Sequence, residues 1–265
     1  MNEKNFEYLR DQVKYTGFGD GLEEELKEKM QQQKPGFVID HEAYYGDDVA
    51  RVSLNFKKSE QNDMYFFNSY KIDFLKENAK ESLEQTFYIN KGSNITMKEA
   101  YNLLEGRAVN KELSNKEGQR YNAWVQMDFK ETDTSGNFKL NHYHQNYGYD
   151  LENTLSRHPI KELENPKFKE DLIDSIKKGN LQSVTFLKDG KEIKYFVEAN
   201  PQFKTINVYD GNRQRINNRQ SKDEKQSEGQ NKTIKDSKKQ SQSTAGDGEA
   251  VPQEKKSRRR QSNSM

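Results

Sequence analysis

Residues 50–56 read Ala-Arg-Val-Ser-Leu-Asn-Phe, with an apolar side chain at every second position. Side chains of a β-strand point to alternate faces, so this pattern predicts a strand with one buried face. Residues 37–44 and a turn at residues 45–47 come before it, which predicts a β-hairpin. Residues 64–74 continue the alternation, with a bulge expected near residues 68 and 69. This part of the chain is therefore expected to form an antiparallel β-meander.

Two amphipathic helices are predicted before this meander. Their apolar positions recur at helical spacing, and they are Phe6, Leu9 and Val13 in the first helix and Leu22, Leu26 and Met30 in the second. Glycines at positions 17, 19 and 21 separate the helices, and Pro35-Gly36 ends the second one. Residues 1–76 are thus expected to form an N-terminal α-α-β-β-β unit.

Helix and strand patterns continue to residue 216, and we expect a C-terminal α+β domain over residues 83–216. Thr96 and Glu99 form a capping box that opens one helix, and Asn165 followed by Pro166 opens another. The apolar positions expected to face the core from this second helix are Phe168, Leu172, Ile173 and Ile176. A short helix is predicted at residues 150–155, and strands are predicted at residues 86–89, 121–129, 138–144, 184–187, 193–197 and 203–209. The expected fold class is α+β, with small antiparallel β-meanders that are each backed by one or two helices.

The hydrophobic pattern of residues 52–72 resembles that of residues 183–206, and each stretch follows a lysine-rich amphipathic helix. Repeated units would explain this similarity, because short repeats predict stacked copies of one structural unit. Chance similarity between generic hairpins is the alternative, and the sequence leaves both open.

Residues 217–265 differ in composition from the rest of the chain. They contain no aromatic residue and are rich in Gln, Ser and Lys, so they cannot bury enough apolar surface to offset the entropy of folding. We expect them to form a disordered basic tail. This tail carries twelve Lys and Arg residues against seven Asp and Glu residues, whereas residues 1–216 have a net charge of −4.

Composition excludes several classes of protein. The chain of 265 residues has no cysteine, which excludes disulfides, thiolate metal sites and cysteine nucleophiles. No apolar run reaches the roughly 18–20 residues that span a bilayer, and the charged N-terminus lacks a signal-peptide pattern. We therefore expect a cytoplasmic protein without a membrane partner, and we expect no cofactor.

His142 and His144 are candidates for chemistry, because residues two apart on a strand point to the same face. A catalytic zinc needs about three protein ligands, and the sequence marks no third one. A place at the rim of the core is the favoured interpretation of these histidines. Asp128 and Trp124 lie on the polar face of the preceding strand. Trp124 either packs beneath a helix, which we favour, or offers an exposed binding surface.

Two features bear on nucleic-acid binding. Basic residues near the C-terminus would attract phosphate groups non-specifically, with an affinity that falls steeply as salt rises. These candidates are Lys255, Lys256, Arg258, Arg259 and Arg260. Tyrosines on the predicted strands could stack on bases, namely Tyr65, Tyr88, Tyr143 and Tyr195. The net negative charge of residues 1–216 argues against a basic nucleic-acid-binding groove.

Several strings between residues 91 and 216 carry a resemblance to a known family. They are Ile95-Thr96-x-x-Glu99-Ala100-Tyr101-Asn102-Leu103-Leu104-x-Gly106-Arg107-Ala108-Val109, Tyr147-Gly148-Tyr149-Asp150-Leu151, Lys178-Gly179-Asn180 and Ala199-Asn200-Pro201-Gln202-Phe203-Lys204-Thr205. Together they resemble an uncharacterised bacterial family, known only as a domain of unknown function, that occurs on conjugative and mobilisable elements. The resemblance implies a cargo or accessory protein of a mobile element, and it supplies no catalytic residues.

The function we expect is a non-enzymatic accessory or binding protein of a bacterial mobile genetic element, with a protein or a nucleic acid as its partner. One alternative is a DNA-processing accessory in conjugation or mobilisation, anchored on phosphate by its basic tail. The other is a metal-dependent enzyme that uses His142 and His144. Arg107, which follows a helix-ending glycine, and Asn200, which precedes a proline, are interpreted as structural residues.

Overall fold

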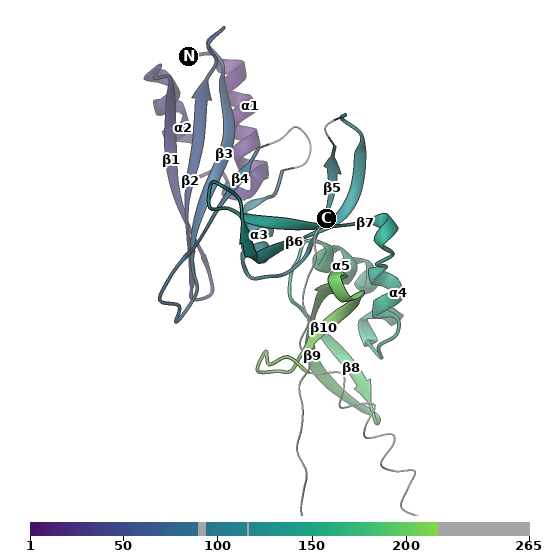
Figure 1. The fold of residues 1–265 in the computed structure, drawn as a ribbon. Coiled ribbons are helices and arrows are strands. Elements are labelled where there is room, and N and C mark those ends of the chain that lie inside the picture. Colours follow the sequence, from purple (N-terminus) through teal and green to yellow (C-terminus); the bar gives the residue numbers. More distant parts are fainter. Residues whose placement is uncertain (90–93, 116, 217–265) are drawn as a thin grey trace, which may run out of the picture. The chain divides into compact units, whose positions relative to one another are not determined.

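The computed structural model describes residues 1–89, 94–115 and 117–216. Over these ranges the chain forms three antiparallel sheets, and each sheet is a meander of strands that follow one another in the sequence (Figure 1). Helices precede every sheet, so the predicted α+β fold class is confirmed. No helix within these ranges is long and apolar enough to cross a membrane. The predicted disordered tail, residues 217–265, lies outside the described residues.

The first sheet has four strands in the order β1-β2-β3-β4. The elements of this unit are α1 (Glu3–Val13), α2 (Glu23–Gln31), β1 (Gly36–Tyr45), β2 (Asp48–Lys58), β3 (Tyr65–Leu75) and β4 (Leu83–Tyr88). Gly46 has a φ of 69° at the first position of the two-residue β1–β2 turn, as a type II′ turn requires. Asn55 pairs with Ser69 whereas Phe56 pairs with Phe67, so the predicted bulge is confirmed at Asn68.

The strand β4 belongs to the first sheet, although its residues were expected at the start of the C-terminal domain. It pairs antiparallel with β3, and Tyr70 of β3 faces Phe87 of β4. Both rings are buried, so the pair extends the core of the first sheet. The N-terminal unit therefore continues past residue 76, because the short connector before β4 joins two neighbouring strands.

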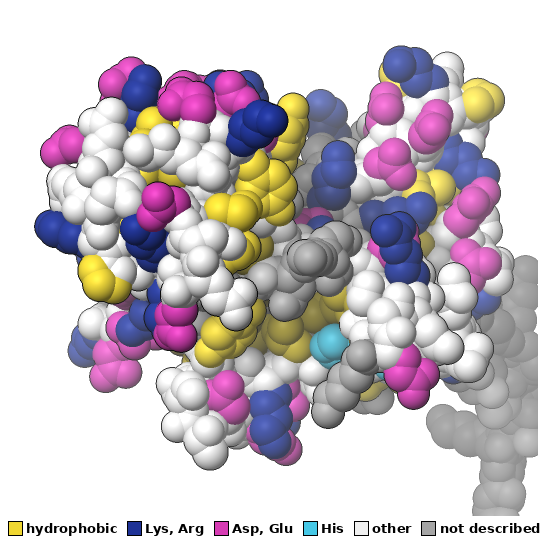
Figure 2. Space-filling model, turned by 90° about the horizontal axis from the view of Figure 1, so that it is seen from above, with side chains coloured by type: hydrophobic (Ala, Val, Ile, Leu, Met, Phe, Trp, Pro, Cys, Tyr) yellow, Lys and Arg dark blue, Asp and Glu magenta, His cyan; other side chains and the backbone are white. Residues whose placement is uncertain are grey.

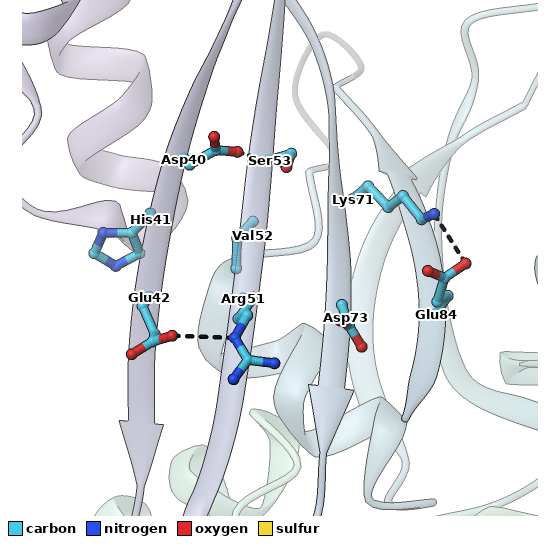
Figure 3. Close-up of a pocket in the computed structure, with 9 residues that line it drawn as sticks. All are labelled: Asp40, His41, Glu42, Arg51, Val52, Ser53, Lys71, Asp73 and Glu84. Carbon is cyan, nitrogen blue, oxygen red and sulfur yellow. Dashed lines mark hydrogen bonds and ion pairs between the residues drawn. The ribbon is translucent and has the colours of Figure 1, made fainter. Parts of the chain in front are cut away.

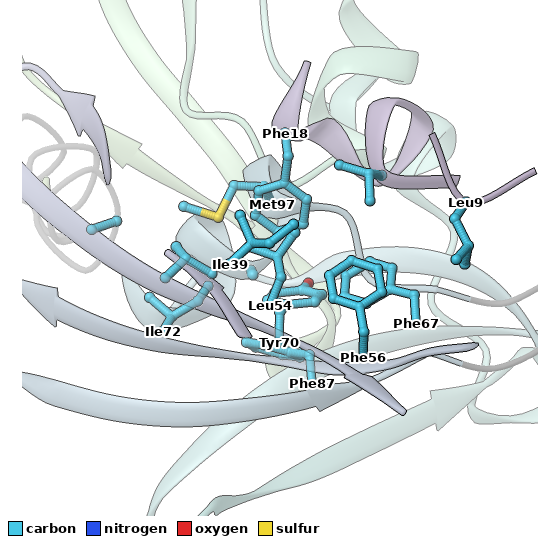
Figure 4. Packing of buried hydrophobic residues seen from close by; sticks show 14 of the residues in the cluster. Leu9, Phe18, Ile39, Leu54, Phe56, Phe67, Tyr70, Ile72, Phe87 and Met97 are labelled. Carbon is cyan, nitrogen blue, oxygen red and sulfur yellow. The ribbon is translucent and has the colours of Figure 1, made fainter. Parts of the chain in front are cut away.

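The first core lies between this sheet and the helices. The inward residues of β1–β4 form one cluster with α1, α2 and the helical turn between them, and α3 (Met97–Leu104) joins the same cluster. Figure 4 shows side chains from these layers interleaved, with Phe18 edge-on to Tyr70 at 5.3 Å between ring centroids. The apolar positions that the sequence predicted for α1 are all buried, which confirms its inward face.

The middle sheet contains one strand, β5, that was not predicted from the sequence. Its strands are β5 (Val109–Ser114), β6 (Arg120–Thr132) and β7 (Phe138–His144). Only Val109 is buried on the short β5, so this strand has a weak periodic signal. Both faces of β6 are covered, because Val125 and Met127 join the first core whereas Trp124 joins a second core. The middle sheet thus connects the two cores.

The third sheet and two helices enclose the second core. The elements of this unit are α4 (Leu151–Leu155), α5 (Pro166–Lys177), β8 (Gln182–Lys188), β9 (Lys191–Asn200) and β10 (Thr205–Tyr209). Short helical turns along the described chain cover Lys14–Phe18, Gln145–Tyr147, Lys161–Glu164 and Pro201–Phe203. Asn165 caps α5 as predicted, by accepting hydrogen bonds from two backbone N–H groups. Phe168, which we expected to face the core, is 56% exposed in the first turn of α5.

The order of elements bears on the repeat hypothesis. Each of the three sheets is an antiparallel meander that follows a helix, which is the order that repeated units require. Units with unrelated sequences can also form a meander that follows a helix, so this shared topology does not show that the units are repeats. The repeat itself therefore stays a prediction.

Candidate functional site

The helices pack on one face of the β1–β4 sheet, and the side chains of its other face are exposed or half-buried. We call this second surface the outer face. The two faces alternate along each strand, since Phe37 and Ile39 of β1 are buried whereas Val38 and Asp40 are exposed. The positions that build the core therefore also determine which residues form the outer face.

Charged residues form two cross-strand rows on the outer face (Figure 3). The strand register places Asp40, Ser53 and Lys71 in one row and Glu42, Arg51, Asp73 and Glu84 in the next. The Ser53 hydroxyl donates to Asp40 Oδ1 at 2.7 Å, and Lys71 Nζ lies 2.9 Å from Glu84 Oε2. Arg51 Nε donates to Glu42 Oε2 at 3.3 Å. Opposite charges in neighbouring positions stabilise strand pairing modestly, so these rows support the sheet.

The rows surround a shallow pocket of about 470 Å³. Ser53 and Asp73 have short side chains between longer ones, and this difference in length hollows the surface (Figure 3). Asp73 Oδ1 is buried, and no described residue donates a hydrogen bond to it. An unsatisfied buried oxygen typically costs about 1–3 kcal/mol. A donor from a bound molecule, or a rotation of Arg51 on the neighbouring strand, would remove this cost.

Exposed apolar side chains border the charged rows. Val38 is 43% exposed and Tyr88 is 62% exposed, and the register places both in one cross-strand row at the end of the sheet. Phe66 is 47% exposed in the next row, opposite Lys57. Tyr44 is exposed at the other end of β1. Aromatic side chains among charged and polar ones are typical of protein–protein interfaces.

Arg107 belongs to a structural junction. Arg107 Nη2 donates to Asn102 Oδ1 at 2.9 Å, and Asn102 Nδ2 donates to the Lys178 carbonyl at 2.7 Å. A Cβ atom on Gly179 would lie only 2.9 Å from Asn102 Cβ, so glycine is needed at this close approach. These residues come from two of the strings that carry the family resemblance, and they join α3 to the turn after α5. The structural interpretation of Arg107 is confirmed.

Asn200 also makes structural contacts. Its side chain accepts a hydrogen bond from Phe203 N at 3.3 Å and thereby caps the helical turn at Pro201–Phe203. Its Nδ2 donates to Asn207 Oδ1 at 2.8 Å, and Asn207 in turn donates to Glu198 at 2.7 Å. Because Asn200 is buried and its polar atoms are partnered within the fold, its structural interpretation is confirmed.

A polar pocket of about 330 Å³ lies beside this junction, and two of its carboxylates, Glu105 and Glu198, have partners within the fold. Glu105 lies 2.7 Å from Lys76 and 3.3 Å from Arg107. Glu198 accepts a hydrogen bond from the Tyr209 hydroxyl at 2.7 Å, and burial raises the pKa of Tyr209 above its usual value. The carboxylates of Glu105 and Glu198 therefore stabilise contacts between elements of the fold. The outer face is the stronger candidate for a binding site.

Trp124 lies in the second core, which corrects the expectation of an exposed binding surface there. Its side chain is 6% exposed, and its ring lies 5.4 Å from that of Tyr149, measured between centroids. Leu155 of α4 and Ile176 of α5 belong to the same cluster. The other interpretation of Trp124, packing beneath a helix, is confirmed, because even-numbered positions of β6 face this layer.

His142 and His144 lie on the face of the middle sheet opposite to Trp124, since the register pairs His142 with Val125. Their ring centroids are 6.3 Å apart, and burial lowers the pKa of His142 below its usual value. Within the described ranges, no three His, Asp or Glu side chains are grouped so that they could hold a metal ion. Asp128 shares the face of Trp124, so these four residues do not converge in one cleft.

The residues considered for nucleic-acid contact do not form one surface. Tyr65 is fully buried and cannot stack on a base, and Tyr143 and Tyr195 pack against the second core. Tyr88 is exposed on the outer face. Figure 2 shows basic and acidic side chains interspersed over the viewed surface, with hydrophobic ones among them. The candidates Lys255, Lys256, Arg258, Arg259 and Arg260 lie outside the described residues.

The outer face was not recognised from the sequence, because its charged rows exist only once the strand register is known. One signal was present in Phe66, an apolar residue on the polar side of an alternating strand. No protein-family model, curated protein or solved structure matches this chain. The resemblance to a mobile-element family therefore stays a prediction.

Proposed function

We propose that this chain is a non-enzymatic binding protein that binds a protein partner on the outer face of the β1–β4 sheet. We also propose that it serves as an accessory protein of a bacterial mobile genetic element, as the resemblance implies. The observation that carries the first proposal is the exposure of Val38, Phe66 and Tyr88 on a sheet whose other face already holds its helices. Burying such side chains in an interface is favourable by about 25 cal/mol per Å² of apolar surface.

A protein partner fits the outer face better than a nucleic acid. The pocket is lined by four Asp and Glu residues but by only one arginine and one lysine, Arg51 and Lys71. Surfaces that bind phosphate carry an excess of Lys and Arg, so this balance disfavours DNA or RNA on the outer face. Opposite charges at fixed positions suit a protein interface, where they select the partner and set its orientation.

Site-specific photo-crosslinking in bacterial cells that carry the native neighbouring genes tests this proposal. Benzoyl-phenylalanine replaces Phe66 or Tyr88 in the full-length protein, and the matched control carries it at Phe168, which is similarly exposed on α5. We expect the two outer-face positions to give a discrete crosslinked protein that the control position does not give. Equal crosslinking from all three positions, or none from the outer face, would contradict the proposal.

The basic residues at the C-terminus support a second candidate function, that of a DNA-processing accessory anchored on phosphate. A variant with glutamine in place of Lys255, Lys256, Arg258, Arg259 and Arg260 loses five positive charges from one cluster. We expect it to bind DNA more weakly and with a flatter salt dependence between about 50 and 200 mM, as mobility-shift assays would measure.

The matched control for this variant removes the same charge from dispersed positions. It carries glutamine in place of Lys222, Lys225, Lys232, Lys235 and Lys238. A cluster that acts as an anchor predicts a larger loss of DNA binding in the first variant than in the control. Equal losses in both variants, or no loss in the first, would remove the anchoring role of the cluster.

A further inference from the structure

The strand β1 is an edge of the first sheet, because it pairs with β2 on one side only. Tyr45 pairs with Asp48 across the two-residue turn, so the odd-numbered residues of β1 form the narrow hydrogen-bonded pairs with β2. The backbone N–H and C=O groups of the even-numbered residues then point away from β2, toward the open side. These residues are Val38, Asp40, Glu42 and Tyr44, whose side chains lie on the outer face.

Three other sheet edges, those of β4, β8 and β10, make hydrogen bonds with neighbouring segments. On β4, Thr86 N donates to Asn137 Oδ1 at 2.8 Å, and on β8, Thr185 N donates to the Glu162 carboxylate at 2.9 Å. On β10, the chain after the strand folds back, and a backbone hydrogen bond joins residues 216 and 208. No residue in the described ranges makes such a contact with the outward backbone groups of β1. This edge is therefore open to a further strand.

The strand β1 also lacks three of the features that usually keep an edge strand from pairing, namely proline, lysine and a β-bulge. Its sequence, Gly-Phe-Val-Ile-Asp-His-Glu-Ala-Tyr-Tyr, contains neither proline nor lysine. Its register with β2 runs from Gly36 to Tyr45 without a bulge. A long and regular edge of this kind is a template for strand addition, a common mode of peptide recognition.

Charge decides which kind of strand fits this edge. Asp40 and Glu42 stand at the open ends of the two cross-strand rows. A second copy of β1 fits poorly, because an antiparallel pair centred on the middle of the strand places these carboxylates opposite acidic residues of the other copy. Like charges directly opposite each other are destabilising. A strand with Lys or Arg at two alternating positions would instead place a cation opposite each carboxylate.

We propose that the edge of β1 binds an extended, basic segment of the partner protein as an added antiparallel strand. This inference rests on the proposed function, and it names how the partner is held. Backbone hydrogen bonds to the even-numbered residues of β1 provide affinity. The carboxylates of Asp40 and Glu42 select Lys or Arg at positions two apart, which fixes the register of the added strand.

The test uses the full-length protein and a synthetic seven-residue peptide, blocked at both ends, in which lysine alternates with valine. NMR titration and amide hydrogen exchange report where the peptide binds. We expect the amide protons of Val38, Asp40, Glu42 and Tyr44 to become protected from exchange. A peptide with glutamate in place of lysine, and one N-methylated at alternate amides, are each expected to bind about tenfold more weakly.

Two variants at opposite ends of one cross-strand row separate the edge from general charge effects. Glu42→Lys and Glu84→Lys change the charge equally, and each breaks one ion pair, with Arg51 and with Lys71 respectively. We expect Glu42→Lys to weaken binding of the lysine peptide about threefold to tenfold and Glu84→Lys to leave it unchanged. Equal effects of the two variants, or binding that survives N-methylation, would overturn the inference.

Failure of this inference is distinguishable from failure of the proposed function. If the lysine peptide does not protect β1 while crosslinks from Phe66 persist, the partner binds the outer face in another way and the edge inference is wrong. If the peptide protects β1 while outer-face crosslinks are absent, the edge inference holds and the proposed use of the outer face is wrong.

Discussion

At the scale of single residues, Gly179 illustrates how one backbone position holds distant elements together. Its φ is 81°, and a Cβ atom there would lie 2.9 Å from both Asn102 Cβ and Val109 Cγ2. Glycine adopts this φ without strain and lets the turn after α5 approach α3 and β5 closely. Asn102 can then donate to the Lys178 carbonyl, which would otherwise lack this partner.

We expect Gly179→Ala to lower the free energy of unfolding by about 1–3 kcal/mol, because both the positive φ and the close contacts oppose a Cβ atom. Gly190→Ala is the matched control. Gly190 has a φ of 73° but no atom within 4 Å of its Cβ position, so only backbone strain is added there. Urea denaturation measures both variants, and equal destabilisation would mean that the contacts around Gly179 contribute nothing.

At the scale of elements, α3 begins where its capping box predicts. The Thr96 side chain accepts a hydrogen bond from Glu99 N, and the Glu99 carboxylate accepts one from Thr96 N at 2.8 Å. Lys111 of β5 lies 2.9 Å from the same carboxylate. The Glu99 carboxylate therefore caps α3 and also holds β5 against it, although the hydrophobic periodicity of β5 is weak.

Thr96→Ala is expected to lower the free energy of unfolding by about 0.5–2 kcal/mol, because a backbone N–H in the first turn of α3 loses its acceptor. Thr96→Ser keeps the hydroxyl group and serves as the control, so we expect it to stay close to the original stability. Thermal and urea denaturation compare the two variants. A serine variant as unstable as the alanine variant would assign the effect to the lost methyl group instead of the cap.

At the scale of the whole molecule, β6 couples the two cores. Val125 and Met127 on one face belong to the first core, and Trp124 on the other face belongs to the second. Since one strand supplies buried side chains to both, loss of either core removes the packing that orients the other. We therefore expect the described part of the chain to unfold in a single cooperative step.

This coupling can be tested with the single tryptophan of the chain. Leu54 is fully buried in the first core, so Leu54→Ala is expected to cost about 2–5 kcal/mol. Trp124 fluorescence reports the second core, and we expect its urea transition to shift together with far-UV circular dichroism. Ile176→Ala, a matched change in the second core, should shift both signals as well. If Leu54→Ala leaves the urea transition of Trp124 fluorescence unchanged, the two cores unfold separately.

Local signals explain which elements could be predicted. The β1–β2 hairpin, the bulge at Asn68 and the cap at Asn165 each depend on a few neighbouring residues, and the structure confirms them. Two predictions failed: Phe168 was expected in the core but is exposed, and no strand was expected at β5. Whether these residues are buried depends on partners far away in the chain, which outweigh the periodicity of a short stretch.

The sequence by itself determined the fold class, the starts of α3 and α5 and the position of the first hairpin turn, because capping, turn geometry and hydrophobic periodicity act locally. Only the tertiary structure decided that β4 completes the first sheet, that β6 serves two cores and that Asp40, Glu42 and Asp73 share one surface. These features depend on strand pairing and register between distant residues. A shift of register by one residue would turn every side chain of a strand to the other face, so no short stretch of sequence contains this information.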